Sequence, residues 1–293
     1  MRSLSLAFLV LLLSACAAPP SPPPPSPAPA VVAKPPIKVA LALGGGAARG
    51  FAHIGVIKAL EAQGIVPEIV VGTSAGSVVG ALYASGMNGF DLQKLALGLE
   101  EDMFADWALP NRGVLRGEAL QAFINQQVKQ RTLQRLPKPL GVVATDLQSG
   151  ERVLFRTGDT GMAVRASSAV PGVFQPVAIG GRDYVDGGLT SPVPAQSARA
   201  MGADFVIAVD ISSVGRREKL PGTLDVLLQT FAIMGHAISQ HELKDADVVV
   251  RPRTLAVSST SFEDRHLAIL EGEKAAAAIM PELKAKLARA RAR

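Results

Sequence analysis

The sequence predicts an α/β domain in which helices cover both faces of a central, mostly parallel β-sheet. Short apolar segments rich in Val, Leu and Ile alternate with segments of helical periodicity, as expected where strands and helices follow each other along the chain. Hydrophobic residues make up 48% of the 293 residues and aromatic ones only 4%. The core must therefore be mainly aliphatic, which suits a parallel sheet buried on both faces.

The N-terminus has the features of a secretory signal. Arg2 precedes an apolar stretch at 4–13 that is too short to span a bilayer. The next residues, Leu13-Ser14-Ala15-Cys16, resemble the lipobox of bacterial lipoproteins, in which the peptide is cut before the cysteine and the thiol carries a diacylglycerol. Cys16 is the only cysteine, so no disulfide can form within the chain. We expect residues 1–15 to be a lipoprotein signal peptide; the alternative is an ordinary signal peptide in which Cys16 is incidental.

Residues 17–36 predict a tether between the lipidated Cys16 and a folded domain at 37–293. Half of these residues are proline, so the segment cannot form a helix and extends by about 3.1 Å per residue. Ala17 rather than Asp follows the cysteine. By resemblance to Gram-negative lipoproteins, this favours a bacterial cell-envelope location, on the outer membrane facing the periplasm.

The folded domain begins with alternating strands and helices. An apolar run at 37–43 predicts a buried strand, a glycine-rich turn follows at 44–50, and apolar spacing predicts a helix over 51–63. A second strand at 65–71 and a second helix at 75–85 complete an α/β unit of parallel type. We expect further helices at about 118–130, 193–201, 224–243 and from 266 toward the end, strands at 140–145, 153–155, 205–209 and 248–250, and a hairpin over 176–185.

A G-x-S-x-G sequence, Gly72-Thr73-Ser74-Ala75-Gly76, lies between the second strand and the second helix. In this context the serine occupies a sharp strand-to-helix turn, whose strained backbone tolerates only small neighbours such as Gly72 and Gly76. The amino end of the following helix adds positive potential near the attacking oxygen. Ser74 is therefore the candidate nucleophile; the structural alternative is a glycine-rich turn with a capping serine.

The glycine-rich run Gly44-Gly45-Gly46-Ala47-Ala48-Arg49-Gly50 follows the first strand. Its backbone N–H groups can converge on an anion, so a phosphate-binding loop and an oxyanion hole are both conceivable. The run matches neither G-x-x-x-x-G-K-[ST] nor G-x-G-x-x-G, and no acidic residue ends the second strand to hold a ribose. With a nucleophile one strand later, the oxyanion hole is favoured.

A candidate base follows the predicted hairpin in Asp186-Gly187-Gly188. A carboxylate on a loop, beside two glycines that permit close backbone approach, would suit a base for Ser74. Asp-Gly alone is an ordinary turn sequence, so this assignment depends on the other two elements.

These three elements, in this order, resemble the patatin-like phospholipase family. The resemblance covers about residues 37–210. It includes three further segments: Gly50-Phe51-Ala52-His53-Ile54-Gly55-Val56, Thr145-Asp146-Leu147 with Gly150, and Arg165-Ala166-Ser167-Ser168-Ala169-Val170-Pro171-Gly172-Val173-Phe174. It implies a three-layer α/β/α patatin-like fold and a serine lipid acyl hydrolase that cleaves phospholipids or lysophospholipids. In such an enzyme Ser74 attacks the acyl ester, Asp186 takes its proton without a histidine, and the glycine loop holds the oxyanion.

The glycine loop departs from the G-G-G-x-R-G form of plant patatins by one additional residue. We expect the donating amides to be those of Gly45, Gly46 and Ala47. Arg49 is expected to brace the loop, the alternative being contact with a lipid phosphate, and Asp146 and Arg165 to order the walls of the site. The motif residues that support the site are Gly44, Arg49, Gly50, Gly72, Gly76, Gly187 and Gly188.

Histidines decide the main alternative, an α/β-hydrolase with a Ser–Asp–His triad. His236, His241 and His266 follow Asp186 in the order that this triad requires. None lies in a loop after a late strand: the first two fall within a predicted apolar helix and the third starts another. His53 lies just after the glycine loop, and a structural role is expected for each. No cluster of His, Asp or Glu has metal-ligand spacing, so neither a metal nor a cofactor is expected.

Composition limits the remaining classes of function. The net charge is +5, but the last twelve residues contribute +4 and Arg2 one more, so the folded body is near neutral and no nucleic-acid partner is expected. An acyltransferase or thioesterase with the same dyad remains open. A non-enzymatic regulatory lipoprotein is disfavoured because the serine, aspartate and glycine loop are all intact. The oligomeric state is not predicted.

We predict that Cys16 carries a lipid and that Cys16→Ser releases the protein from the membrane. Several acyl chains on one residue make a stable anchor, because each buried CH₂ contributes about 0.8 kcal/mol. Cell fractionation and mass spectrometry of the mature protein measure this outcome, and an unmodified thiol would contradict it.

Overall fold

A computed structural model describes residues 36–100, 103, 106, 114–212, 222–255, 257 and 261–292. The chain separates into two units, Met1–Pro35 and Pro36–Arg293. The predicted signal peptide, Cys16 and all but the last residue of the predicted tether lie outside the described residues.

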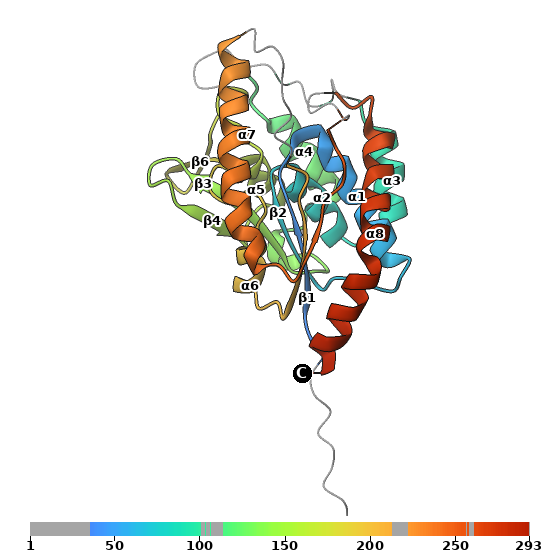
Figure 1. The fold of residues 1–293 in the computed structure, drawn as a ribbon. Coiled ribbons are helices and arrows are strands. Elements are labelled where there is room, and N and C mark those ends of the chain that lie inside the picture. Colours follow the sequence, from blue (N-terminus) through green and yellow to red (C-terminus); the bar gives the residue numbers. More distant parts are fainter. Residues whose placement is uncertain are drawn as a thin grey trace, which may run out of the picture. The chain divides into compact units, whose positions relative to one another are not determined.

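Within the described part of the second unit, eight strands form one sheet in the order β5-β6-β3-β2-β1-β7-β8, with β4 paired to β3 off this path (Figure 1). Strands β3, β2, β1, β7 and β8 run parallel to one another, whereas β4 and β6 are antiparallel to β3 and β5 is antiparallel to β6. The strands are β1 (Val39–Leu43), β2 (Ile69–Thr73), β3 (Leu140–Asp146), β4 (Arg152–Phe155), β5 (Val177–Ile179), β6 (Arg182–Asp186), β7 (Phe205–Val209) and β8 (Val248–Val250). The predicted mostly parallel sheet is therefore confirmed.

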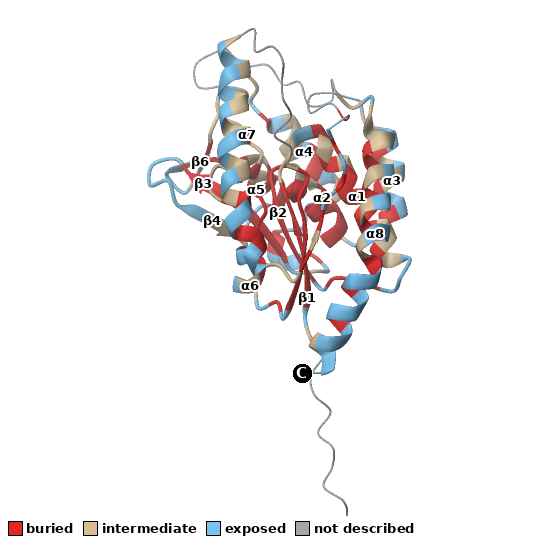
Figure 2. Cartoon of the chain, viewed as in Figure 1, coloured by how far each residue is buried: buried red, intermediate tan, exposed pale blue. Residues whose placement is uncertain are grey.

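Helices cover both faces of this sheet, as a three-layer α/β/α fold requires. Along β1, Leu41 and Leu43 join the core beneath α1, α2 and α8, while Ala40 and Ala42 face the smaller core beneath α6. This alternation follows from the period of two residues in a strand, and Figure 2 shows the buried strands between the two helical layers. The helices are α1 (Ala52–Glu61), α2 (Ala75–Ala84), α3 (Gly89–Leu97), α4 (Glu118–Gln127), α5 (Thr160–Ser167), α6 (Ala195–Ala200), α7 (Thr223–Glu242) and α8 (Arg265–Ala292).

Two helices, α3 and α5, were not predicted from the sequence. Helix α3 begins at a capping box: the Asn88 side chain accepts from the backbone N–H of Asp91, and the Asp91 side chain accepts from that of Asn88. Such a box is a local signal for the start of a helix. Helix α5 is only eight residues long and is capped by Asp159, which accepts from Met162 N–H. Its packing against α4 and β3 stabilises a helix that is too short to show a clear apolar period.

Helix α7 differs from the other long helices in having little buried surface. Only Ser239 and Glu242 are buried among its twenty residues, and Figure 2 shows the rest of the helix as a mixture of exposed and intermediate residues. None of the described helices is long and apolar enough to cross a membrane.

Helices α1 and α8 approach each other closely through glycines. A Cβ added at Gly55 would lie 1.9 Å from Ile269 O, and one at Gly272 would lie 2.0 Å from Ala52 O. Real Cβ atoms do not come so close to backbone oxygens, so any larger residue must separate the two helices.

We predict that Gly272→Ala lowers the free energy of unfolding by about 1–3 kcal/mol, because overpacking forces the backbones apart. Gly98→Ala is the matched control, since a Cβ there lies no closer than 3.6 Å to another atom, Leu95 O. Chemical unfolding of both variants measures the difference. Equal free energies of unfolding for the two variants would contradict the prediction, because they would show that α1 and α8 can move apart without loss of stability.

Candidate active site

Ser74 occupies the sharp turn between β2 and α2. Its backbone angles are φ 53° and ψ −125°, a region that a residue with a side chain occupies only under strain. Gly72 and Gly76 permit the turn: a Cβ at Gly72 would lie 2.4 Å from Gly76 O, and one at Gly76 would lie 2.1 Å from Leu43 O. The strand–turn–helix context expected for a nucleophile is therefore present.

The side chain of Ser74 faces Asp186, the last residue of β6. Ser74 Oγ donates a hydrogen bond of 2.6 Å to Asp186 Oδ2. The other carboxylate oxygen, Oδ1, accepts from Gly188 N–H at 2.7 Å. Both side chains are buried, Ser74 with 8% and Asp186 with 7% of its surface exposed, so the contact is shielded from bulk water.

Strand β3 determines the distance between the two residues. It lies between β2 and β6, and its neighbouring residues Val143 and Ala144 pair with Thr73 and Asp186 respectively. Thr145 Oγ1 also donates to the backbone oxygen of Asp186 at 3.0 Å. The serine and the aspartate therefore reach each other across a single strand.

Burial raises the pKa of Asp186 to about 6, although the hydrogen bonds from Ser74 and Gly188 oppose this rise. A carboxylate with this pKa remains mostly ionised at neutral pH and is more basic than an exposed one. Both properties suit a group that takes a proton from an attacking hydroxyl.

The glycine loop lies directly against the nucleophile, since a Cβ at Gly45 would lie 3.2 Å from Ser74 Cβ. Two of its amides are engaged: Gly44 N–H donates to Val209 O at 3.0 Å and Gly45 N–H to Pro192 O at 2.9 Å. The expectation that Gly45 donates to an oxyanion is therefore contradicted, because its N–H already has an acceptor.

Gly46 and Ala47 remain as donors at the start of the short 3-10 helix Ala47–Phe51. No acceptor for their N–H groups is found among the described residues, as is usual for the first turn of a helix. Their amides, together with the adjoining Ala48, are the part of the loop that can bind a negative oxygen.

Ser167 is a site residue that sequence reasoning missed. Its Oγ accepts a 2.8 Å hydrogen bond from Ser74 N–H and donates to Val143 O. This contact stabilises the strained turn, and it gives the backbone N–H of Ser74 an acceptor. Ser167 belongs to the segment Arg165–Phe174 that the family resemblance includes. The residue pattern of that segment does not indicate a contact with Ser74, which lies 93 positions earlier in the sequence.

None of the four histidines hydrogen-bonds Ser74 or Asp186 in the part of the chain that the structure describes. His53 is fully buried, and its Nε2–H donates to Gly44 O at 2.8 Å. Burial lowers its pKa to about 4, so it is neutral and braces the glycine loop. His236 and His241 lie on α7 and His266 on α8. The geometry offers no support for a triad.

A family model for patatin-like phospholipases matches residues 41–199, which include the glycine loop, Ser74 and Asp186. The chain belongs to the patatin-like phospholipase family. An uncharacterized NTE family protein of Mycobacterium tuberculosis is 37% identical over 190 residues, covering 60% of this chain and 49% of that protein. Human patatin-like phospholipase domain-containing protein 6 is 35% identical over 183 residues, covering 60% of this chain and 13% of its own length.

The fold also agrees with a solved structure. VipD from Legionella pneumophila superposes with a TM-score of 0.59 at 17% identity, covering 85% of this chain and 68% of VipD. This chain spans about half the length of the mycobacterial relative and a much smaller share of the human one.

Three charged residues of the patatin-like domain that the sequence singled out make hydrogen bonds within the fold. Arg49 Nε donates to Gly46 O at 3.2 Å, which is the bracing role expected for it. Asp146 accepts from both Arg182 Nε and Arg182 Nη2, and this guanidinium holds the pKa of Asp146 well below its usual range. Arg165 donates to Arg116 O at 3.0 Å and to Gln121 Oε1 at 3.1 Å. That Asp146 and Arg165 order the walls of the site stays a prediction.

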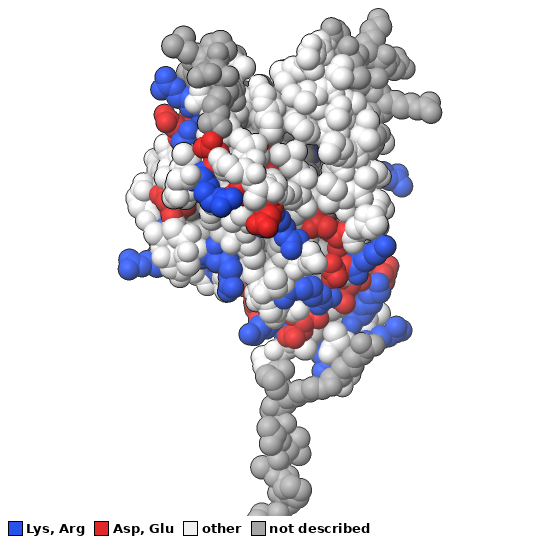
Figure 3. Space-filling view, turned by 90° about the vertical axis from the view of Figure 1, so that its left-hand side faces the viewer, with Lys and Arg blue, Asp and Glu red and all other residues white. Residues whose placement is uncertain are grey.

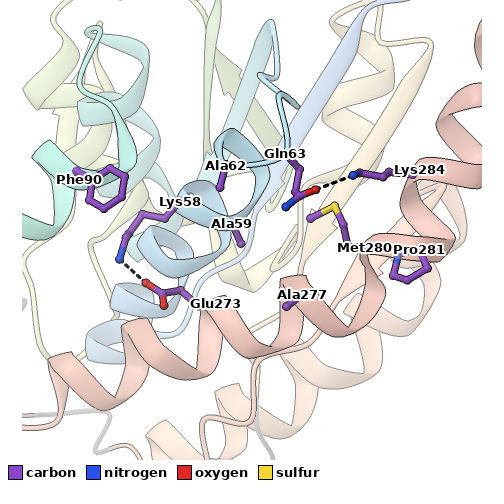
Figure 4. Close-up of a pocket in the computed structure, with 10 residues that line it drawn as sticks. All are labelled: Lys58, Ala59, Ala62, Gln63, Phe90, Glu273, Ala277, Met280, Pro281 and Lys284. Carbon is purple, nitrogen blue, oxygen red and sulfur yellow. Dashed lines mark hydrogen bonds and ion pairs between the residues drawn. The ribbon is translucent and has the colours of Figure 1, made fainter.

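A separate pocket of about 570 Å³ lies between α1, α3 and α8 and contains neither Ser74 nor Asp186 (Figure 4). Its two lysines are already paired, Lys58 with Glu273 and Lys284 with Gln63. The pocket is therefore not the catalytic site. No group of three or more His, Cys, Asp or Glu side chains within the described ranges is arranged to hold a metal ion.

We predict that Asp186→Asn stabilises the folded protein at pH 8 and not at pH 4. Because the folded pKa of about 6 exceeds the ordinary value of 3.8, the parent loses stability as pH rises from about 4 through 6. The shift corresponds to about 3 kcal/mol, an upper figure for the gain in the variant.

Chemical unfolding of parent and variant at the two pH values measures this gain. Asp183→Asn is a suitable control, because Asp183 lies on the same strand and is only partly buried. A variant that is destabilised equally at both pH values would contradict the desolvation of Asp186.

Proposed function

We propose that the protein is a serine lipid acyl hydrolase that cleaves acyl esters of phospholipids or lysophospholipids through Ser74 and Asp186. The observation that carries the proposal is the buried 2.6 Å hydrogen bond from Ser74 Oγ to Asp186 Oδ2. It lies at a strained turn, beside loop amides for which the described residues offer no acceptor. Membership of the patatin-like phospholipase family supports a lipid acyl ester as the substrate.

In the proposed reaction Asp186 accepts the hydroxyl proton as Ser74 Oγ attacks the acyl carbonyl carbon. The N–H groups of Gly46 and Ala47 stabilise the negative oxygen of the tetrahedral intermediate. The intermediate collapses to an acyl-serine, and the departing alcohol takes the proton from Asp186. Water then attacks the acyl-serine, again losing a proton to Asp186, and the fatty acid leaves as Ser74 regains its hydrogen.

The surface around α7 supports a substrate that is presented in a lipid layer. Helix α7 has no Asp, Glu, Lys or Arg between Asp225 and Glu242. It passes over the dyad loop, since a Cβ at Gly235 would lie 3.7 Å from Gly188 O. In Figure 3 the charged side chains lie on the left and across the middle and lower part of the face shown, and its upper right part is largely uncharged. The large hydrophobic side chains that α7 exposes are Leu224, Val226, Leu227, Ile233 and Met234.

We predict that Ser74→Ala and Asp186→Asn each reduce hydrolysis of p-nitrophenyl acyl esters by at least about a thousandfold, because nucleophile and base act as a unit. Asparagine has nearly the shape of aspartate but cannot accept the proton. His236→Gln, His241→Gln and His266→Gln are the matched controls and should each retain a measurable fraction of activity. An indispensable histidine combined with a merely impaired Asp186→Asn would contradict the dyad.

The natural substrate can be identified by comparing lipid digests of the parent with those of Ser74→Ala. Release of free fatty acid from phospholipid or lysophospholipid would support hydrolysis, whereas acyl transfer to added glycerol or lysolipid would identify a transferase that uses the same dyad.

A further inference from the structure

Glu242 is a buried carboxylate outside the proposed dyad, at the carboxyl end of α7. It is 8% exposed. Its Oε1 accepts from Ser191 Oγ, and its Oε2 accepts from Val193 N–H at 3.2 Å. The cation beside it, Arg152 Nη1, lies 3.6 Å from Oε1 and also donates to Gln196 at 2.7 Å.

This position is unfavourable for a negative charge. The carboxyl end of a helix carries negative potential, and burial raises the pKa of Glu242 to about 7. A carboxylate placed at such a cost is retained for the contacts that it makes, and both of its hydrogen bonds go to one loop, Ser191–Val193.

The loop Ser191–Val193 connects three parts of the active site. Ser191 O accepts from Thr73 Oγ1 at 2.8 Å, immediately before the nucleophile. Pro192 O accepts from Gly45 N–H at 2.9 Å, immediately before the unpaired amides of the glycine loop. Ser191 N–H donates to Gly187 O at 2.8 Å, immediately after the proposed base.

We propose that Glu242 is a positioning residue of the acyl-transfer site: by holding Ser191 and Val193 it orients the loop that aligns Thr73, Gly45 and Gly187. The inference rests on the proposed function. Gly45 is bonded to the loop, so a displaced loop would rotate the next amides in the chain, Gly46 and Ala47, away from the position of the oxyanion. Small errors of this kind reduce catalysis strongly while leaving substrate contacts in place.

Two substitutions at position 242 separate the hydrogen bonds from the space that the side chain fills. Glu242→Gln can still accept from Val193 N–H and can donate its amide hydrogen to Ser191 Oγ. Glu242→Leu has a similar size and makes neither bond, yet removing a buried charge need not lower stability. Ser191→Ala removes one bond from the other side. Asp245→Asn is the matched control, because it changes an exposed carboxylate three residues away.

The experiment measures kcat and KM on a p-nitrophenyl ester for the full chain, with active sites counted by complete labelling of Ser74 with a fluorophosphonate. We expect Glu242→Leu to lower kcat per labelled site by about 10- to 100-fold with little change in KM. Glu242→Gln should stay within about threefold of the parent, as should Asp245→Asn. A purely structural role would instead lower the number of labelled sites and leave kcat per site unchanged.

Equal kcat per site in Glu242→Leu and the parent, or equal losses in the Leu and Gln variants, would overturn the proposal. If Glu242→Leu does not fold, Ser191→Ala decides: a lower kcat per site supports the proposal and an unchanged kcat overturns it. A parent that is neither labelled nor active would contradict the proposed function itself, whereas an active parent with an unaffected Leu variant contradicts only the role of Glu242.

Discussion

The hydrogen bond between Ser74 and Asp186 depends on strand β3, which keeps the two residues in register across the sheet. Val143 and Ala144 of β3 pair with Thr73 and Asp186. A shift of β3 by one residue against either neighbour would take Ser74 and Asp186 out of register with each other, because side chains alternate between the two faces of a sheet. The switch from parallel pairing with β2 to antiparallel pairing with β6 is what brings two strand ends from opposite directions to one point. Close backbone approach at Gly187, where a Cβ would lie 2.3 Å from Val143 O, permits the same arrangement.

The ionisable groups around Ser74 and Asp186 differ in whether a nearby opposite charge offsets the cost of burial. Asp146 is paired with Arg182 and its pKa is lowered, so its charge favours the folded state. Asp186 has no ion pair among the described residues, and Glu242 has Arg152 Nη1 at 3.6 Å. Desolvation raises the pKa of both carboxyl groups. His53 is buried and its pKa is lowered. The site thus retains desolvated groups that reduce stability, which is the usual relation between folding and function at a site that handles protons.

Hydrogen bonds to backbone atoms link the parts of the site. His53 and Arg49 donate to the carbonyl oxygens of Gly44 and Gly46, while Thr73 and Gly45 donate to those of Ser191 and Pro192. These contacts orient peptide planes rather than side chains. An oxyanion hole consists of peptide N–H groups, so orienting their planes is the form of preorganisation that it requires. Helix α7 enters this network through Glu242, which connects an apolar surface helix to the proposed catalytic centre.

Local patterns in the sequence determined the parallel strands, the strand–turn–helix context of Ser74 and the glycine loop after β1, because each depends on residues within a few positions of one another. Asp186 could be proposed as the partner of Ser74 only together with these motifs and the family resemblance. The tertiary structure alone decided that the Gly45 amide is engaged, since its acceptor is Pro192 O, on a distant loop. It also revealed Ser167 and Glu242, whose partners lie 93 and 51 positions away. Sequence periodicity and motif spacing cannot predict such contacts, because they join residues that only the folding of the whole sheet brings together.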